Sequence, residues 1–304
     1  MKIEVIVNAS SGAGVNGALA ERLDELFARD NIVPQISLAQ SGHEIVELAK
    51  RAARGDADII VAGGGDGTIN SVAAQLLSTK KSLGVLPLGT MNHFAKDLHI
   101  PLDLEGAVEI IIHGRVANVD LGQVNGHVFV NNSSLGLYPS IVREREKQQR
   151  LGAGKWPAYV WAAIAVLRRY PFLNVRLDAD GKEFFSRTPF VFIGNNEYEM
   201  ETLNIGGRAC LDAGELSLYV TNRTGRLGLV RLAWRALFGG LRQEKDFLAM
   251  CTKQIWIETK HKHIRVALDG EVIRMEPPLH YRVLPGRLRV LAPPNDQERQ
   301  TTTS

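Results

Sequence analysis

The sequence has few cysteines and no large excess of charge of either sign. Its two cysteines, Cys210 and Cys251, are far apart in 304 residues, which argues against a disulfide framework or a cysteine metal site. A formal net charge of +3 is too small to indicate nucleic-acid binding. No apolar run is long enough to span a bilayer, and no apolar signal core follows the start. These absences predict a soluble, cytoplasmic, globular protein.

The most informative stretch is a glycine loop that follows a short apolar run. Residues 57–61, Ala-Asp-Ile-Ile-Val, have the length and branching of a buried strand. Residues 62–70 then read Ala-Gly-Gly-Gly-Asp-Gly-Thr-Ile-Asn, with a helix pattern from Thr68. Three consecutive glycines exceed what a tight turn needs, and they leave backbone N–H groups uncovered beside a helix N-terminus. The stretch predicts a phosphate-binding loop, with Asp66 placed to hold a metal ion or a ribose.

A second loop of this kind follows the next strand pattern. Residues 82–88 form a short apolar strand, and Gly-Thr-Met-Asn at 89–92 opens a helix pattern. Parallel strands end at one edge of a sheet, so both loops are expected to face one crevice together with Asn8 and Ser10. Thr90 and Asn92 offer side-chain hydrogen bonds to phosphate or ribose.

One glycine motif indicates a function that the rest of the sequence excludes. Residues 12–17 match G-x-G-x-x-G, but a dinucleotide fold needs an acidic residue about 20 residues further on. Residues 36–40 read Ile-Ser-Leu-Ala-Gln and contain no carboxylate. An NAD dehydrogenase is therefore excluded. The P-loop and protein-kinase signatures are also absent.

The predicted pattern of secondary structure changes near residue 122. Over 1–122 strands alternate with amphipathic helices, which predicts a doubly wound α/β nucleotide-binding domain. Over 123–292 short alternating runs separated by turns predict a β-rich, sandwich-like domain. The last strand, about 287–292, is expected to return to the first domain, and the polar tail 293–304 is expected to be disordered. Expected strands are 2–8, 34–38, 57–62, 83–88, 127–131, 174–178, 190–193, 216–220, 254–258 and 263–267, and expected helices are 17–30, 43–54 and 68–78.

These motifs resemble the diacylglycerol kinase catalytic-domain family, which includes bacterial lipid kinases and the sphingosine and ceramide kinases. The GGDGT loop of the family is matched by Gly64–Thr68, and its GTxND-F-A-R pattern by residues 89–96, with His93 in place of the aspartate. A late DGE is matched by Asp269-Gly270-Glu271. The resemblance covers essentially the whole chain. It implies an NAD kinase/diacylglycerol kinase-like fold and transfer of phosphate from ATP, with Mg²⁺, to a lipid hydroxyl.

The resemblance also implies roles for individual residues. Either Asp269 or Glu271 would accept the substrate proton, although Asp-Gly by itself is typical of a hairpin turn. The residues expected to bind the nucleotide are Asn8, Ser10, Gly64, Gly65, Asp66, Gly67, Thr68, Asn70, Gly89, Thr90 and Asn92. The residues expected to bind metal are Asp66, Asp120, Asp212 and Glu215. The last two lie in a segment that holds a structural Mg²⁺ in some relatives, where Ala213 stands in place of a carboxylate.

Two apolar segments support a lipid partner. Residues 156–167 are apolar and aromatic, and residues 227–241 place Trp234 and several leucines on one helix face beside arginines. Such a helix suits an anionic membrane surface, but it could equally pack on the β-rich domain. The expected partner is a lipid substrate at the inner face of the membrane. The protein could associate with the membrane peripherally and could form a homodimer. No nucleic acid is expected as a partner.

Two other functions stay open. An NAD kinase shares the GGDGT loop, but its second motif differs from Gly-Thr-x-Asn. The second is a catalytically weak lipid-binding or regulatory protein, an alternative motivated by His93 and Ala213, although the presence of Asp66, Asp269 and Glu271 favours an enzyme. ATP turnover that disappears in Asp66→Ala would exclude this second alternative.

Overall fold

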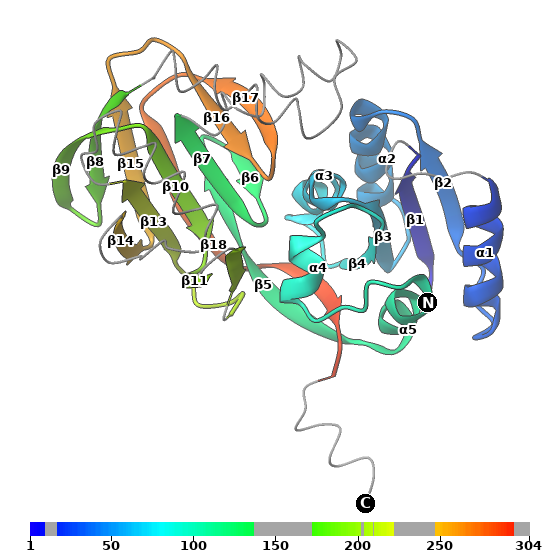
Figure 1. Cartoon of the computed structure of the whole chain (residues 1–304). Coiled ribbons are helices and arrows are strands. Elements are labelled where there is room, and N and C mark those ends of the chain that lie inside the picture. The colour runs from blue at the N-terminus through cyan, green and yellow to red at the C-terminus, as the bar shows by residue number, and fades with distance from the viewer. Residues whose placement is uncertain (10–16, 137–171, 202–203, 209, 222–246, 295–304) are drawn as a thin grey trace, which may run out of the picture. The chain divides into compact units, whose positions relative to one another are not determined.

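The computed structural model in Figure 1 describes residues 1–9, 17–136, 172–201, 204–208, 210–221 and 247–294. The chain divides into two compact units. One comprises Met1–Asp120 with Gly286–Ser304, and the other comprises Leu121–Pro285. Several expectations fall outside the described residues, namely Ser10, positions 12–16, the apolar segments 156–167 and 227–241, and the tail from residue 295.

The first unit is built on a parallel sheet, drawn in blue and cyan in Figure 1. Its strands are β1 (Ile3–Asn8), β2 (Gln35–Ala39), β3 (Ile59–Gly64) and β4 (Ser82–Pro87). They are ordered β2-β1-β3-β4, and β4 pairs with β18 (Leu279–Ala292) through Leu83 and Val290. The chain therefore reverses its direction of winding between β1 and β3. In such sheets ligands bind at the carboxyl ends of the strands beside this reversal.

Helices connect these strands, as the predicted α/β fold class requires. They are α1 (Gly17–Ala28), α2 (Gly42–Arg54), α3 (Asp66–Leu76), α4 (His93–Asp97) and α5 (Leu104–His113). Strand β3 extends two residues beyond its predicted end because Gly63 and Gly64 pair with Leu86 and Pro87 of β4. Among the described residues, no helix is both long and apolar enough to cross a membrane.

Helix α2 shows how the sequence sets one of these elements. Its start is capped by Ser41, whose Oγ accepts the N–H of Glu44 at 3.2 Å, while the Glu44 carboxylate accepts the N–H of Gln40 at 2.7 Å. These reciprocal bonds satisfy donors that a helix start leaves open. The predicted apolar face is buried and consists of Ile45, Leu48, Ala49 and Ala52.

The second unit is antiparallel and carries the predicted β-rich fold. One sheet contains β8 (Leu173–Ala179), β9 (Lys182–Thr188), β15 (Gln254–Thr259) and the first part of β18. The other has the order β14-β13-β10-β7-β16-β17, formed by Phe247–Thr252, Leu216–Thr221, Phe190–Asn195, Asn132–Gly136, Ile264–Leu268 and Glu271–Met275. Strands β11 (Tyr198–Glu201) and β12 (Asn204–Arg208) pair with each other, as do β5 (Arg115–Val124) and β6 (His127–Phe129).

Alternating side chains of both sheets form one core in this unit. Leu177 and Ile257 of the first sheet and Ile193 and Val266 of the second are completely buried in the same cluster. Outward positions between them are polar or exposed, such as Arg176 on β8. This pattern of inner and outer residues is that of a sandwich.

A close pair on β5 and β6 provides a test of this packing. Gly122 lies opposite Phe129, and a Cβ at Gly122 would stand 2.1 Å from Cζ of that ring. We expect Gly122→Ala to lower the free energy of unfolding by about 1–3 kcal/mol, because the buried ring must move. Gly42→Ala, which meets no atom within 4 Å, is the matched control. The urea concentration at half unfolding is measured for wild type, Gly122→Ala and Gly42→Ala. Equal midpoints for all three proteins would contradict the close packing of Gly122 against Phe129.

Candidate active site

The first candidate region lies where β3 ends and α3 begins. Gly64 has no room for a side chain, since a Cβ there would lie 2.5 Å from Oγ1 of Thr68. That hydroxyl accepts a hydrogen bond from the Asn8 amide at 3.1 Å, which joins the end of β1 to the first turn of α3. Asn8, Gly64 and Thr68 therefore meet at the winding reversal, where the sheet topology places a ligand site.

The second glycine loop lies directly against the first. A Cβ at Gly89 would stand 2.4 Å from Cα of Gly65, and the N–H of Leu88 donates to the carbonyl of Gly64 at 3.1 Å. Only glycine permits two backbones to approach this closely. The two loops thus form one continuous edge in the first unit.

Asp66 connects the two loops through its carboxylate. Its Oδ2 accepts the backbone N–H of His93 at 3.2 Å, and its Oδ1 accepts that of Phe94 at 3.0 Å. These are the first N–H groups of α4, where an acceptor is otherwise missing. Asp66 is half-buried and lies in the first turn of α3. From the first turn of α3, Asp66 therefore fixes the position of the start of α4.

Asn92 shapes the second loop from within. Its Oδ1 accepts the N–H of Gly89 at 3.0 Å, and its Nδ2 donates to the carbonyls of Pro87 and Gly89 at 3.0 and 2.9 Å. The residue is buried and adopts a φ of +49°. Its amide is thus engaged inside the loop, whereas the neighbouring Thr90 is exposed.

The remaining expected residues of the first unit occupy different places. Gly67 and Asn70 lie on α3, both half-buried. Asp120 is 2% exposed on β5, and its Oδ1 accepts the N–H of Gly286 at 2.8 Å. Gly286 has a φ of +57°, so this bond holds an unusual backbone in β18. Asp120 thereby fastens β18 within the first unit.

The second candidate region is the Asp-Gly turn between β16 and β17. Asp269 and Gly270 have φ values of +46° and +90° and connect the paired residues Leu268 and Glu271. Positive φ at both positions is typical of the two-residue hairpin turn that Asp-Gly favours. The hairpin interpretation of this motif is therefore confirmed.

The Asp269 carboxylate is fixed by three backbone N–H groups. Its Oδ2 accepts from Val130 at 2.7 Å, and its Oδ1 accepts from Asn131 and Asn132, both at 2.9 Å. The Asp269 N–H donates in turn to the carbonyl of Asn132 at 3.0 Å. These bonds tie the turn to Val130 and Asn131, between β6 and β7, and to Asn132, the first residue of β7.

Glu271 has a different environment from Asp269. Its side chain is exposed, yet partial desolvation by the surrounding protein raises the pKa of its carboxyl above the ordinary value of 4.5. Desolvation disfavours the charged form of an acid and so strengthens its tendency to take up a proton. The motif therefore presents one anchored carboxylate and one exposed carboxylate of raised pKa.

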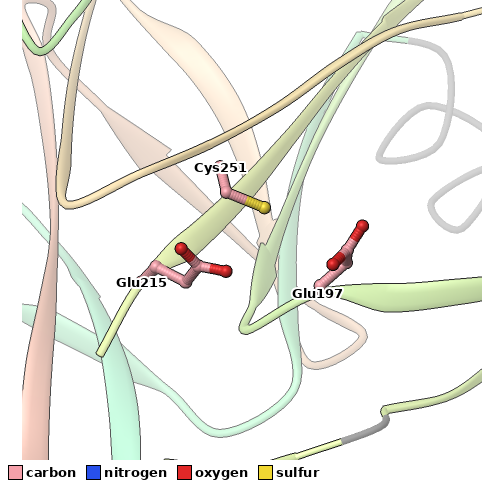
Figure 2. Close-up of side chains that lie close together, drawn as sticks. All are labelled: Glu197, Glu215 and Cys251. Atoms are coloured by element: carbon pink, nitrogen blue, oxygen red, sulfur yellow. The ribbon is translucent and has the colours of Figure 1, made fainter. Parts of the chain in front are cut away.

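Glu215 belongs to a cluster that sequence reasoning missed. Figure 2 shows Glu215, Glu197 and Cys251, each of which offers a ligand atom within 4.8 Å of the other two. Among the described residues, this is the one group of three such side chains, and the exposed Asp212 is outside it. Cys251 joins the cluster through the pairing of β13 with β14, a strand that no sequence pattern predicted.

Comparisons with known proteins agree on the two-part organisation. The diacylglycerol kinase catalytic domain model matches residues 2–124, and the YegS C-terminal NAD kinase beta sandwich-like domain model matches 136–292. A curated Staphylococcus aureus (strain JH9) diacylglycerol kinase is 28% identical over 260 residues, covering 81% of this chain and 82% of the relative.

Solved structures show the same fold. A crystal structure of a diacylglycerol kinase from Bacillus anthracis (strain Sterne) matches with a TM-score of 0.71 at 21% identity, over 96% of this chain and 97% of that one. A second chain from that organism matches with a TM-score of 0.76 at 24% identity, over 96% and 95%.

The fold, the paired glycine loops and these matches define a kinase, a phosphotransferase with a hydroxyl group as acceptor. The chain belongs to the diacylglycerol kinase catalytic-domain family, with the β-sandwich-like domain that accompanies it. The resemblance inferred from the GGDGT, GTxN and DGE motifs is confirmed. The coarse function that follows is that of a lipid kinase.

The contact between the two loops gives a prediction about nucleotide binding. Gly89→Ala should weaken ATP binding at least about tenfold, because the added Cβ would push the second loop away from Gly65. Gly55→Ala is the control, since a Cβ there meets only ordinary contacts at 3.5 Å. Calorimetric titration with ATP measures both, and unchanged affinity in Gly89→Ala would show that the loop contact is unimportant for the nucleotide.

The Cys251 cluster gives a prediction about reactivity. Partial desolvation by the surrounding protein, followed by the hydrogen bond and charge of Glu215, raises the pKa of the Cys251 thiol from 9.0 to about 12. The test uses Cys210→Ser, which removes the other thiol, at pH 8.5 with a chelator present. Iodoacetamide should then modify Cys251 at least about tenfold more slowly than an ordinary thiol, because less of it is thiolate. Glu215→Gln should speed the reaction, because removing a neighbouring carboxylate lowers the pKa. Modification at the ordinary rate would refute this account, since Cys251 is exposed and reagent access is open.

Proposed function

We propose that the protein transfers the γ-phosphoryl group of ATP to the hydroxyl of a diacylglycerol-like lipid. The observation that carries the proposal is the Asp66 carboxylate, which holds the two glycine loops together at the ligand edge of the parallel sheet. Membership of the diacylglycerol kinase family supports the lipid acceptor.

The first unit suits the phosphates of a nucleotide. The N-cap of helix α3 is Gly65, which has no side chain, so the N-cap supplies no competing side-chain acceptor for the first-turn N–H groups. A helix N-terminus carries partial positive charge and binds anions. In the proposed complex, residues 64–68 and Gly89 cradle phosphate, Asn8, Asn70 and Thr90 contact the nucleotide, and Asn92 acts by holding its loop. Ser10, which lies outside the described residues, keeps its expected role as a contact of the nucleotide.

The donor set also suits Mg²⁺. This ion takes one or two carboxylates together with substrate phosphates, and Asp66 is the carboxylate placed between the two loops. When bound, the ion would neutralise charge on the phosphates. Asp120 is proposed as a further acidic group of this unit, and Asp212 and Glu215 as ligands of a separate structural ion.

Glu271 is the proposed proton acceptor. It is exposed at the start of β17, directly after the turn, and its raised pKa lies closer to neutral pH, which favours general base catalysis. Asp269 accepts three N–H groups and so holds the turn that presents Glu271. We propose that the lipid is met at the inner face of the membrane by peripheral association, and that a homodimer is compatible with this activity.

Transfer of labelled γ-phosphate from ATP to a panel of micellar lipids and to NAD tests the proposal. Wild type should label diacylglycerol, and Glu271→Gln should lower kcat by about 10²–10⁴-fold while ATP binding persists. Glu276→Gln, an exposed glutamate at the end of the same hairpin, is the matched control and should keep full activity. Label on NAD would support an NAD kinase instead, and no transfer at all would favour a lipid-binding protein.

The pH dependence separates the two carboxylates of the turn. Glu271 must lose its proton to act, so kcat/KM of wild type should rise with pH through an apparent pKa above 4.5. Asp269→Asn should lower the unfolding temperature as well as activity, because three N–H groups lose an anionic acceptor. If Glu271→Gln retained full activity and the same rise of kcat/KM with pH, Glu271 would not be the proton acceptor.

A further inference from the structure

Arg208 is a buried cation of the second unit that the proposed chemistry has not used. It ends β12 and is 6% exposed, which is rare for an arginine. Its Nη1 donates to the carbonyl of Val130 at 2.8 Å and to that of Asn195 at 3.2 Å. Its Nη2 donates to Oδ1 of Asn131 at 2.9 Å. The planar guanidinium thus donates hydrogen bonds to two consecutive residues between β6 and β7, Val130 and Asn131.

The same two residues hold the catalytic turn on their other side. The Val130 carbonyl that accepts from Arg208 belongs to the peptide group whose N–H is that of Asn131, and this N–H donates to Asp269. One peptide group therefore has a guanidinium at its carbonyl end and a carboxylate at its amide end. Hydrogen bonds in such a chain polarise and strengthen one another.

Asn195 also binds the segment of Val130 and Asn131 that Arg208 holds. Its Nδ2 donates to the Val130 carbonyl at 2.8 Å, and its backbone N–H donates to the Asn131 carbonyl at 2.9 Å. Asn195 is 1% exposed, and Arg208 also lies 5.8 Å from the ring centroid of Tyr198. The segment is therefore held from behind by buried groups and offers its N–H groups to Asp269.

We propose that Arg208 is a positioning residue for phosphoryl transfer: it fixes residues 130–132, these fix Asp269, and the turn then presents Glu271. This inference rests on the proposed role of Glu271. An arginine suits the task, because its fork reaches a carbonyl and an amide oxygen at once, whereas a lysine is a single point donor. Arg208 acts through other groups and needs no contact with substrate.

Kinetics of four variants test the role. Arg208→Met should lower kcat roughly 10- to 100-fold with the KM for ATP unchanged, since a small misplacement of a reacting group has effects of this size. Arg208→Lys should recover part of the loss. Arg265→Met, which removes an exposed arginine from β16, is the matched control and should leave kcat unchanged. In a Glu271→Gln background, Arg208→Met should reduce kcat little further, because both changes act on one step.

Amide hydrogen exchange supplies a readout that needs no activity. Arg208→Met and Arg208→Lys should accelerate exchange of the Val130, Asn131 and Asn132 amides at least about tenfold, whereas Arg265→Met should not. Unchanged exchange would overturn the inference, as would an equal loss of kcat from Arg208→Met in the wild-type and Glu271→Gln backgrounds. If wild type transferred no phosphate, the proposed function would fail, and exchange at residues 130–132 would still decide whether Arg208 holds the segment.

Discussion

Both candidate regions depend on carboxylates that accept backbone N–H groups. Asp66 accepts from the start of α4, Asp269 accepts from three successive residues, and Asp120 accepts from Gly286 of β18. Each bond satisfies donors that no helix or sheet ladder pairs, and a buried donor left without an acceptor would cost free energy. The loops of the candidate regions are therefore positioned by charged groups as well as by packing of the core.

In the proposed mechanism the two acidic residues of the DGE motif have different roles. Asp269 accepts three backbone N–H groups and would keep the turn rigid, while the exposed Glu271 would act as the base. Arg208 extends the rigid part inward by one further layer of hydrogen bonds. A catalytic group needs such a supporting layer, because a loosely held carboxylate seldom lies in the geometry that reacts.

The sequence predicted much of the first unit, since glycine spacing and apolar periodicity are local signals. The buried face of α2 and the placement of the GGDGT motif where β3 passes into α3 follow directly from them. The limits of α3 did not: the helix begins at Asp66, two residues before the predicted start, and the Asp66 carboxylate accepts N–H groups of α4, a contact that no local pattern reveals. Arg208 and the Cys251 cluster were missed because strand pairing brings their partners together from distant positions. The turn was predicted, but the three N–H groups that make it rigid come from residues 137 to 139 positions away.

The most direct test of the central claim is amide hydrogen exchange of the wild-type protein with and without ATP and Mg²⁺. The account predicts added protection at residues 63–68 and 89–94, the two loops that Asp66 joins. The same experiment on Asp66→Ala should show this protection lost. Nucleotide that binds while leaving both loops unprotected would contradict the account, because the nucleotide site would then lie elsewhere in the chain.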